Sequence, residues 1–137
     1  MFKIRNEQAD TLADEDLVRR IIAYLKVRMP QQIARHDPFD LRAVIKHCFG
    51  VARSYDVYSE RGLFTFVMDM LGVGPGFHTQ PRIRSILERR DIDELVRLDR
   101  IVDEVDDASW EEARRMTDPG VYWDGVLKQA DGERGQR

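Results

Sequence analysis

The sequence lacks most of the features that usually indicate a function. It contains a single cysteine, so an internal disulfide is excluded. No apolar run approaches the roughly 20 residues that a membrane-spanning helix requires. The N-terminus, MFKIRNEQAD, has no apolar stretch of the kind found in secretory signals. These absences predict a cytoplasmic protein without a membrane partner.

Motifs for catalysis and metal binding are also missing. There is no C-x-x-C or H-E-x-x-H spacing that would suggest zinc. His47 and Cys48 are adjacent on an expected helix, so their side chains diverge by about 100° and cannot act as base and nucleophile. His36 and His78 are expected at surface or loop positions, and Cys48 in the core. The sequence therefore predicts a protein that is not an enzyme, with no catalytic residue, cofactor or metal.

A glycine-rich segment at Gly72, Gly74 and Gly76 superficially resembles a phosphate-binding loop. It follows an expected helix, however, and the G-K-[ST] ending of a phosphate loop is absent. The glycines are expected to cap the helix and turn the chain sharply, so that Phe77 folds back onto the core.

Charge is low overall and unevenly distributed. The net charge is −3, which does not favour long-range attraction to nucleic acid. A small arginine cluster at residues 82–90 has no interleaved aromatics, so no nucleic-acid partner is predicted. Residues 69–137 hold 16 of the 25 acidic residues, six of them Asp103, Glu104, Asp106, Asp107, Glu111 and Glu112. This acidic stretch is either a solvated corner between helices or a docking patch for a basic partner.

Helical periodicity dominates the chain, and no alternating β-branched segment competes with it. We expect an all-α, single-domain bundle of about five to seven short amphipathic helices within residues 1–129, followed by a frayed polar tail at 130–137. The first helix should have acidic residues 14–16 in its first turn and end before Pro30.

The expected central helix begins at Ser59, a good N-cap, and has a wide apolar face. That face consists of Leu63, Phe64, Phe66, Val67, Met70 and Leu71. Further along, Asp91 and Glu94 have the spacing of a capping box. The apolar stripe of the helix that follows is expected to comprise Ile92, Leu95, Leu98, Val102 and Val105.

Aromatic side chains are the best candidates for contact with a partner, because Tyr and Trp are enriched at interface hot spots. They could equally close the ends of a small core. Tyr58 and Tyr122 are expected to be the more exposed ones, since each lies next to a helix start. The candidate partner-binding residues are Tyr58, Arg61, Phe77, Glu111, Glu112, Tyr122 and Trp123.

One segment has a recognisable pattern, A-R-x-Y-x-x-x-S-E-R followed by F-V-x-x-M-x-x-x-G and a phenylalanine. Its residues are Ala52, Arg53, Tyr55, Ser59, Glu60, Arg61, Phe66, Val67, Met70, Gly74 and Phe77. Together with the M-F-x-I-R-x-E-Q start, this pattern resembles small accessory proteins encoded in bacterial type VI secretion effector clusters. The resemblance covers residues 1 to about 90.

The resemblance implies a stoichiometric binding protein. Such a protein would act as a co-chaperone that helps an adaptor chaperone stabilise a toxic effector or load it onto the secretion spike. The expected assembly is a hetero-complex with the adaptor, the effector or both, rather than a homo-oligomer. The alternative is an immunity protein that binds and neutralises a cognate toxin.

Overall fold

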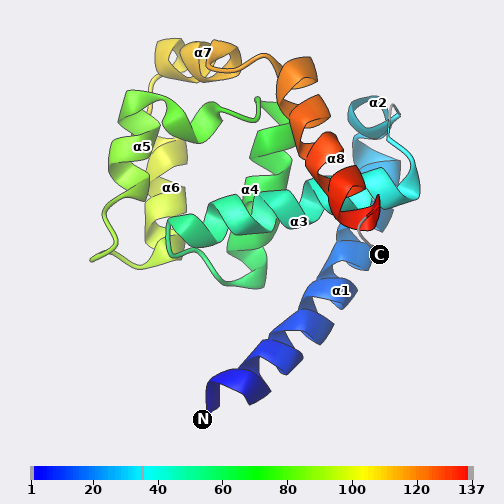
Figure 1. The fold of residues 1–137 in the computed structure, drawn as a ribbon. Coiled ribbons are helices and arrows are strands. Elements are labelled where there is room, and N and C mark those ends of the chain that lie inside the picture. The colour runs from blue at the N-terminus through cyan, green and yellow to red at the C-terminus, as the bar shows by residue number, and fades with distance from the viewer. Residues whose placement is uncertain (1, 35, 136–137) are drawn as a thin grey trace. The chain divides into compact units, whose positions relative to one another are not determined.

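The computed structural model describes the backbone of residues 2–34 and 36–135, and the side chains of 14–34, 36–38 and 40–132. Within these residues there are eight α-helices and one 3₁₀ helix, and no strand (Figure 1). The all-α prediction is confirmed, whereas the expected count of five to seven helices is too low. The helix that the sequence pattern did not indicate is α2 (Pro30–Ile33), a single turn that begins at Pro30.

The described helices group into two compact units, within residues 1–42 and 43–137. The first unit contains α1 (Phe2–Arg28), α2 and the start of α3 (Pro38–Ser54). α1 begins at Phe2, so the prediction that acidic residues 14–16 form its first turn is wrong. Its predicted end before Pro30 is confirmed, because proline suits the first position of the next helix. The boundary predicted at residue 129 stays a prediction.

The second unit contains the remainder of α3 and six further elements. These are α4 (Glu60–Gly72), η1 (Phe77–Thr79), α5 (Pro81–Leu87), α6 (Glu94–Glu104), α7 (Asp107–Arg115) and α8 (Pro119–Gly135). α6 packs against α4 and α5, and η1 contacts α5 and α7. α8 continues to Gly135 through most of the stretch expected to fray, and residues 136–137 lie outside the described part.

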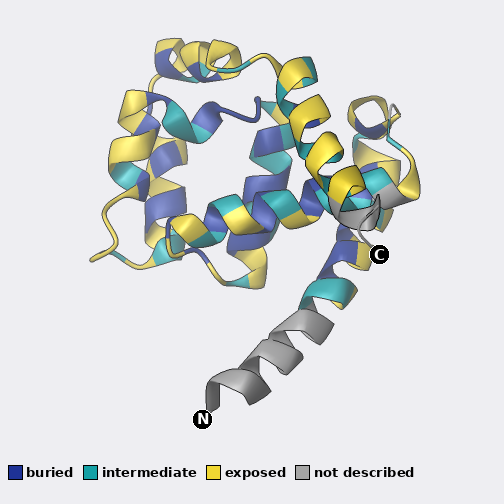
Figure 2. Cartoon of the chain, viewed as in Figure 1, coloured by how far each residue is buried: buried dark blue, intermediate teal, exposed yellow. Residues whose placement is uncertain are grey.

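The core of the second unit is built around α4, as the sequence predicted. Leu63, Phe66, Val67 and Met70 are buried on one side of this helix (Figure 2). The ring of Phe66 lies 5.4 Å from that of Phe77, which η1 brings back onto the core. The predicted return of Phe77 is therefore confirmed. Phe64 and Leu71 are only partly buried, so the apolar face is narrower than expected.

The sequence misplaced the start and the buried face of α6. Its N-cap is Asp93, whose carboxylate accepts the N–H of Leu95 at 3.0 Å. Asp91 does not cap this helix, because its carboxylate pairs with Arg89 in the preceding turn. Val102, expected in the stripe, is 72% exposed, and Ile101 is buried instead. The predicted capping box of this helix is therefore wrong, and its predicted apolar stripe is wrong at Val102.

The glycine-rich segment is shaped by close packing. α4 ends at Gly72, as expected, but its C-cap residue is Val73 and not a glycine, and no described glycine has a positive φ. A Cβ added to Gly76 would instead lie 2.9 Å from Cβ of Thr117, in the turn between α7 and α8. A side chain larger than hydrogen at this position would push that turn away.

Candidate functional site

Loop 55–59, between α3 and α4, is fixed by the carboxylate of Glu94 in the first turn of α6. Glu94 accepts the backbone N–H of Tyr58 at 3.0 Å and of Ser59 at 2.9 Å, and it also accepts the Ser59 hydroxyl. Ser59 Oγ in turn accepts the N–H of Gly62, which confirms its predicted role as N-cap of α4. We call this arrangement the Glu94 clamp. It is a capping box whose acidic member comes from a distant helix.

The clamp also sets the charge state of Glu94. Burial by itself raises the pKa of this carboxyl. Hydrogen bonds from the Ser59 hydroxyl and from the N–H groups of Tyr58 and Ser59, together with the nearby charge of Arg97, outweigh burial and hold the pKa below its usual value. The carboxylate therefore stays ionised at neutral pH and neutralises the positive end of α4.

Gly62 makes room for this carboxylate. A Cβ at position 62 would lie 2.8 Å from Glu94 Oε1 and 3.0 Å from Ser59 Oγ, and it would collide with the side chain of Val57. These distances are shorter than ordinary van der Waals contact. The clamp therefore depends on glycine at this position in the first turn of α4.

Arg97, one turn after Glu94, holds the other side of the same loop. Its side chain is only 2% exposed, and its partners are all carbonyl oxygens. They are Tyr55 O at 2.7 Å, Leu87 O at 2.6 Å, Ile92 O at 2.9 Å and Asp56 O at 3.3 Å. Carbonyls at helix C-termini carry the negative end of the helix dipole. The ends of α3 and α5 thus stabilise a buried cation.

The turn that these two side chains enclose has a left-handed residue at its centre. Asp56 has φ of 59°, a conformation that aspartate tolerates better than most side chains. The N–H of Val57 donates to Ala52 O at 3.1 Å and closes the end of α3. Asp56 also pairs with Arg90 at 3.2 Å. Every residue from 55 to 59 therefore takes part in a hydrogen bond that fixes the turn.

The predicted partner-binding residues are distributed over loop 55–59 and four helices. Tyr58 and Arg61 lie together at the start of α4, and both are exposed, as predicted for Tyr58. Glu111 and Glu112 are exposed on α7. Glu111 already pairs with Arg114 and Arg115, and Glu112 accepts the side-chain amide of Gln80.

The other three predicted contacts are wholly or partly internal. Phe77 is fully buried, and Trp123 is only 4% exposed. Tyr122, expected to be exposed, is half-buried, and its hydroxyl is hydrogen-bonded to His47 Nε2. The burial of Phe77 and Trp123 favours the alternative that these rings close the core, since a buried ring offers no surface to a partner.

The two histidines of the second unit are paired with tyrosines. His78 Nδ1 lies 2.8 Å from the Tyr55 hydroxyl, and burial, with a smaller effect of Arg84, lowers the pKa of His78 to about 4. Burial also lowers the pKa of His47. Both rings are half-buried and not free at the surface. Because their pKa values are lowered, both are neutral at pH 7. Cys48 is fully buried, as predicted, and burial raises the pKa of its thiol.

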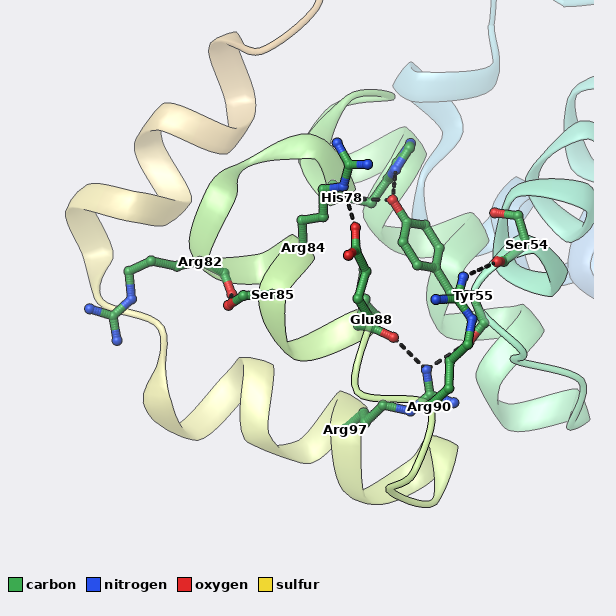
Figure 3. A network of polar contacts seen from close by, with 10 residues as sticks. Ser54, Tyr55, His78, Arg82, Arg84, Ser85, Glu88, Arg90 and Arg97 are labelled. Atoms are coloured by element: carbon green, nitrogen blue, oxygen red, sulfur yellow. Dashed lines mark hydrogen bonds and ion pairs between the residues drawn. The ribbon is translucent and has the colours of Figure 1, made fainter.

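The arginines of the cluster at residues 82–90 all make contacts within the fold. Arg84 pairs with Glu88, and Arg90 donates to Ser54 O at 2.6 Å and lies 6.0 Å from the Tyr55 ring. Figure 3 shows this network, with Arg82 directed away from Tyr55. Arg82 donates to the carbonyl of Glu104.

Sequence reasoning missed two polar residues that fix the fold and one desolvated carboxyl group. Arg97 interrupts an apolar stripe, which is a weak signal for a buried charge, and Glu94 was assigned to the wrong cap. Asp69 gave no signal. It lies half-buried on α4, where burial raises the pKa of its carboxyl to about 7.

Among the residues that the structure describes, no three His, Cys, Asp or Glu side chains gather in a way that could hold a metal ion. In the same part of the chain, no helix has both the length and the apolar composition needed to cross a bilayer. No family model, curated protein or solved structure matches the chain.

Proposed function

We propose that this chain is a non-catalytic, cytoplasmic protein-binding factor, and that it acts as a co-chaperone assisting an adaptor with a type VI secretion effector. The observation that carries the binding role is the contrast between interior and surface in the second unit. Its histidines and its cysteine are engaged or buried, whereas a tyrosine and an arginine are exposed beside a rigid loop. An exposed aromatic side chain on a backbone held by hydrogen bonds suits binding, because less backbone entropy is lost on contact.

The secretion role is supported by the resemblance of residues 52–77, several of which lie in loop 55–59 or in the first turn of α4. Tyr55, Ser59 and Arg61 are part of that pattern. The proposed complex is heteromeric, with an adaptor, an effector or both, and contains no nucleic acid, membrane or cofactor.

An immunity role is the second candidate, and the acidic surface favours it. Asp99 and Asp103 of α6 and Asp107 of α7 are exposed and make no ion pair among the described residues. Unpaired carboxylates complement a basic toxin surface and accelerate association with it.

The test is affinity capture of the tagged full-length chain from its native host, followed by quantitative mass spectrometry. Enrichment of an adaptor or adaptor–effector complex from the same gene cluster is the expected result. A captured toxin whose activity is abolished at one-to-one stoichiometry would establish the immunity alternative. Enrichment of neither class would contradict both.

A further inference from the structure

We propose that Tyr58 and Arg61 form a preorganised contact surface that binds a segment of a partner protein carrying a carboxylate beside an apolar side chain. This inference rests on the proposed binding function and gives it a location and a chemistry. Three observations support it: the lack of a partner for the Arg61 side chain, the exposure of Tyr58, and the hydrogen bonds that hold the loop between α3 and α4.

Arg61 differs from the other described arginines of the second unit. Each of the others has a partner: Arg53, Arg82, Arg84, Arg89, Arg90, Arg97, Arg100, Arg114 and Arg115 contact a carboxylate, a carbonyl or an aromatic ring. The exposed Arg61 side chain makes no ion pair or hydrogen bond with the described residues, although its carbonyl accepts the Thr65 hydroxyl at 2.8 Å. Its five N–H donors are therefore available to a ligand.

Tyr58 is 59% exposed, the most exposed aromatic ring among the described side chains. It lies three residues before Arg61, at the entry to α4. Tyr and Arg are the residue types, with Trp, that dominate binding energy in protein interfaces. Their occurrence together at one helix start is therefore a stronger signal than either residue alone.

The Glu94 clamp holds the backbone from which both side chains extend. The N–H of Tyr58 is bonded to Glu94, and the helix that carries Arg61 is capped by Ser59, which the same carboxylate fixes. Arg97 holds the preceding carbonyls of the loop. A contact presented from a fixed backbone loses less conformational entropy on binding.

The chemistry of the ligand follows from the two side chains. The planar guanidinium of Arg61 matches a carboxylate, which can accept two parallel hydrogen bonds from it. The ring of Tyr58 offers apolar area next to that charge. A nucleic-acid backbone would require further free cations, and Arg89 and Arg90 are already paired with carboxylates.

The first test selects phage-displayed peptides on the purified full-length chain. Selected sequences are expected to contain Asp or Glu next to an apolar or aromatic residue. Corresponding synthetic peptides are then measured by calorimetry. Tyr58→Ala and Arg61→Ala should each weaken binding by about fivefold or more, as expected for a contact worth about 1 kcal/mol. Arg61→Lys should restore only part of the lost affinity, because lysine keeps the positive charge but cannot donate two parallel hydrogen bonds to one carboxylate.

Arg115→Ala is the matched control, since it removes an exposed arginine that pairs with Glu111 on another helix. It should leave peptide affinity unchanged. Circular dichroism and thermal melting of all variants exclude unfolding as the cause of any loss. Peptides without an acidic residue, equal binding by wild type and both alanine variants, or failure to select any peptide would overturn the proposal. A self-associating chain whose dimer is lost on Arg61→Ala would also overturn it.

A second arm separates this surface from the proposed function. The capture from host lysate is repeated with Tyr58→Ala and Arg61→Ala. If the adaptor is captured equally by wild type and variants, the surface proposal fails while the co-chaperone function stands. If the peptides depend on both residues but the captured protein is unrelated to secretion, the surface stands and the co-chaperone function fails.

Discussion

Gly62 shows how a single residue decides whether the Glu94 clamp can form. Alanine is about 1 kcal/mol better than glycine inside a helix. At position 62, however, a Cβ would come within 2.8 Å of Glu94 Oε1 and within 3.0 Å of Ser59 Oγ. The steric conflict should outweigh helix propensity, because it displaces a carboxylate that satisfies several donors at the start of α4.

We therefore expect Gly62→Ala to lower the free energy of unfolding by about 1–3 kcal/mol, as other overpacking substitutions do. Gly50→Ala is the control, since a Cβ at this exposed position in α3 would have no neighbour within 4 Å. It should raise stability by up to about 1 kcal/mol. Urea denaturation measures both. A change of the same sign in the two variants would contradict our account of Gly62.

At the scale of residues, the sequence predicted those roles that depend only on neighbours close in the chain. Ser59 was identified as a cap and Cys48 as a core residue, because the helical pattern around each is local. The position of Trp123 could not be predicted in this way. Its ring lies 6.1 Å from that of His47, on a helix far earlier in the chain, and no local pattern encodes that contact.

The first turns of α6 bind the ends of three other helices. Glu94 binds the start of α4, while Arg97 binds the end of α5 and the turn that follows α3. Its remaining inner face is apolar. α6 therefore contributes both hydrophobic burial and the polar contacts that set the geometry of loop 55–59.

Arg97→Ala should destabilise the protein by about 3–5 kcal/mol, because it leaves buried carbonyls without a donor and opens a cavity. Arg97→Lys should recover only part of this loss, since a single ammonium group cannot reach four carbonyls. Arg100→Ala on the same helix removes an exposed pair with Glu104 and should cost no more than about 0.5 kcal/mol. Equal midpoints of denaturation for Arg97→Ala and Arg100→Ala would contradict the assigned role of Arg97.

Helix existence was predictable at the scale of elements, and helix ends were less so. α1 ends before Pro30 as predicted, Pro119 begins α8, and Gly72 is the last residue of α4. The start of α6 was misplaced because Asp91 and Glu94 satisfy the capping-box spacing. Only the fold shows that Asp91 forms an ion pair with Arg89 and that Glu94 binds the start of a different helix, α4.

For the whole molecule, stability should depend on pH through groups that act in opposite directions. The pKa of His78 is lowered to about 4, so the folded state resists its protonation, and stability is lost as pH falls below the unfolded value near 6.5. The pKa of Asp69 is raised to about 7, so the folded state favours its protonation. That carboxyl therefore destabilises the protein progressively as pH rises from about 4 to above 7.

His78→Gln should consequently remove the loss of stability that protonation of His78 causes on the acid side of the profile. Glutamine keeps a polar side chain near the Tyr55 hydroxyl but cannot become charged, so the extra loss between pH 6 and pH 4 should shrink. The measurement is the free energy of unfolding across that range. An unchanged slope of the unfolding free energy against pH would show that His78 does not titrate as its burial implies. His47, whose pKa burial also lowers, would then be the histidine to replace.

The identity of a partner was the least predictable property at this scale. Helical periodicity predicts an all-α fold, and many partners are compatible with such a fold. The fold narrows the choice by showing that the exposed Arg61 has no partner among the described residues, whereas Arg84, Arg89 and Arg90 pair with nearby carboxylates. That distinction depends on side-chain pairing in three dimensions, so the arginines look equivalent in sequence.

The alkaline side of the profile should be governed by Asp69. Asp69→Asn removes the desolvated charge, so it should stabilise the protein at pH 8 by about 1–4 kcal/mol, the range set by a shift of about three pKa units discounted for partial exposure. At pH 4 the wild-type carboxyl is protonated, and the two proteins should melt within about 1–2 °C of each other. Asp99→Asn, at an exposed position on α6, should leave the melting temperature nearly unchanged at both pH values. A gain from Asp69→Asn that is equal at pH 4 and pH 8 would mean that improved packing, and not relief of a buried charge, is the cause.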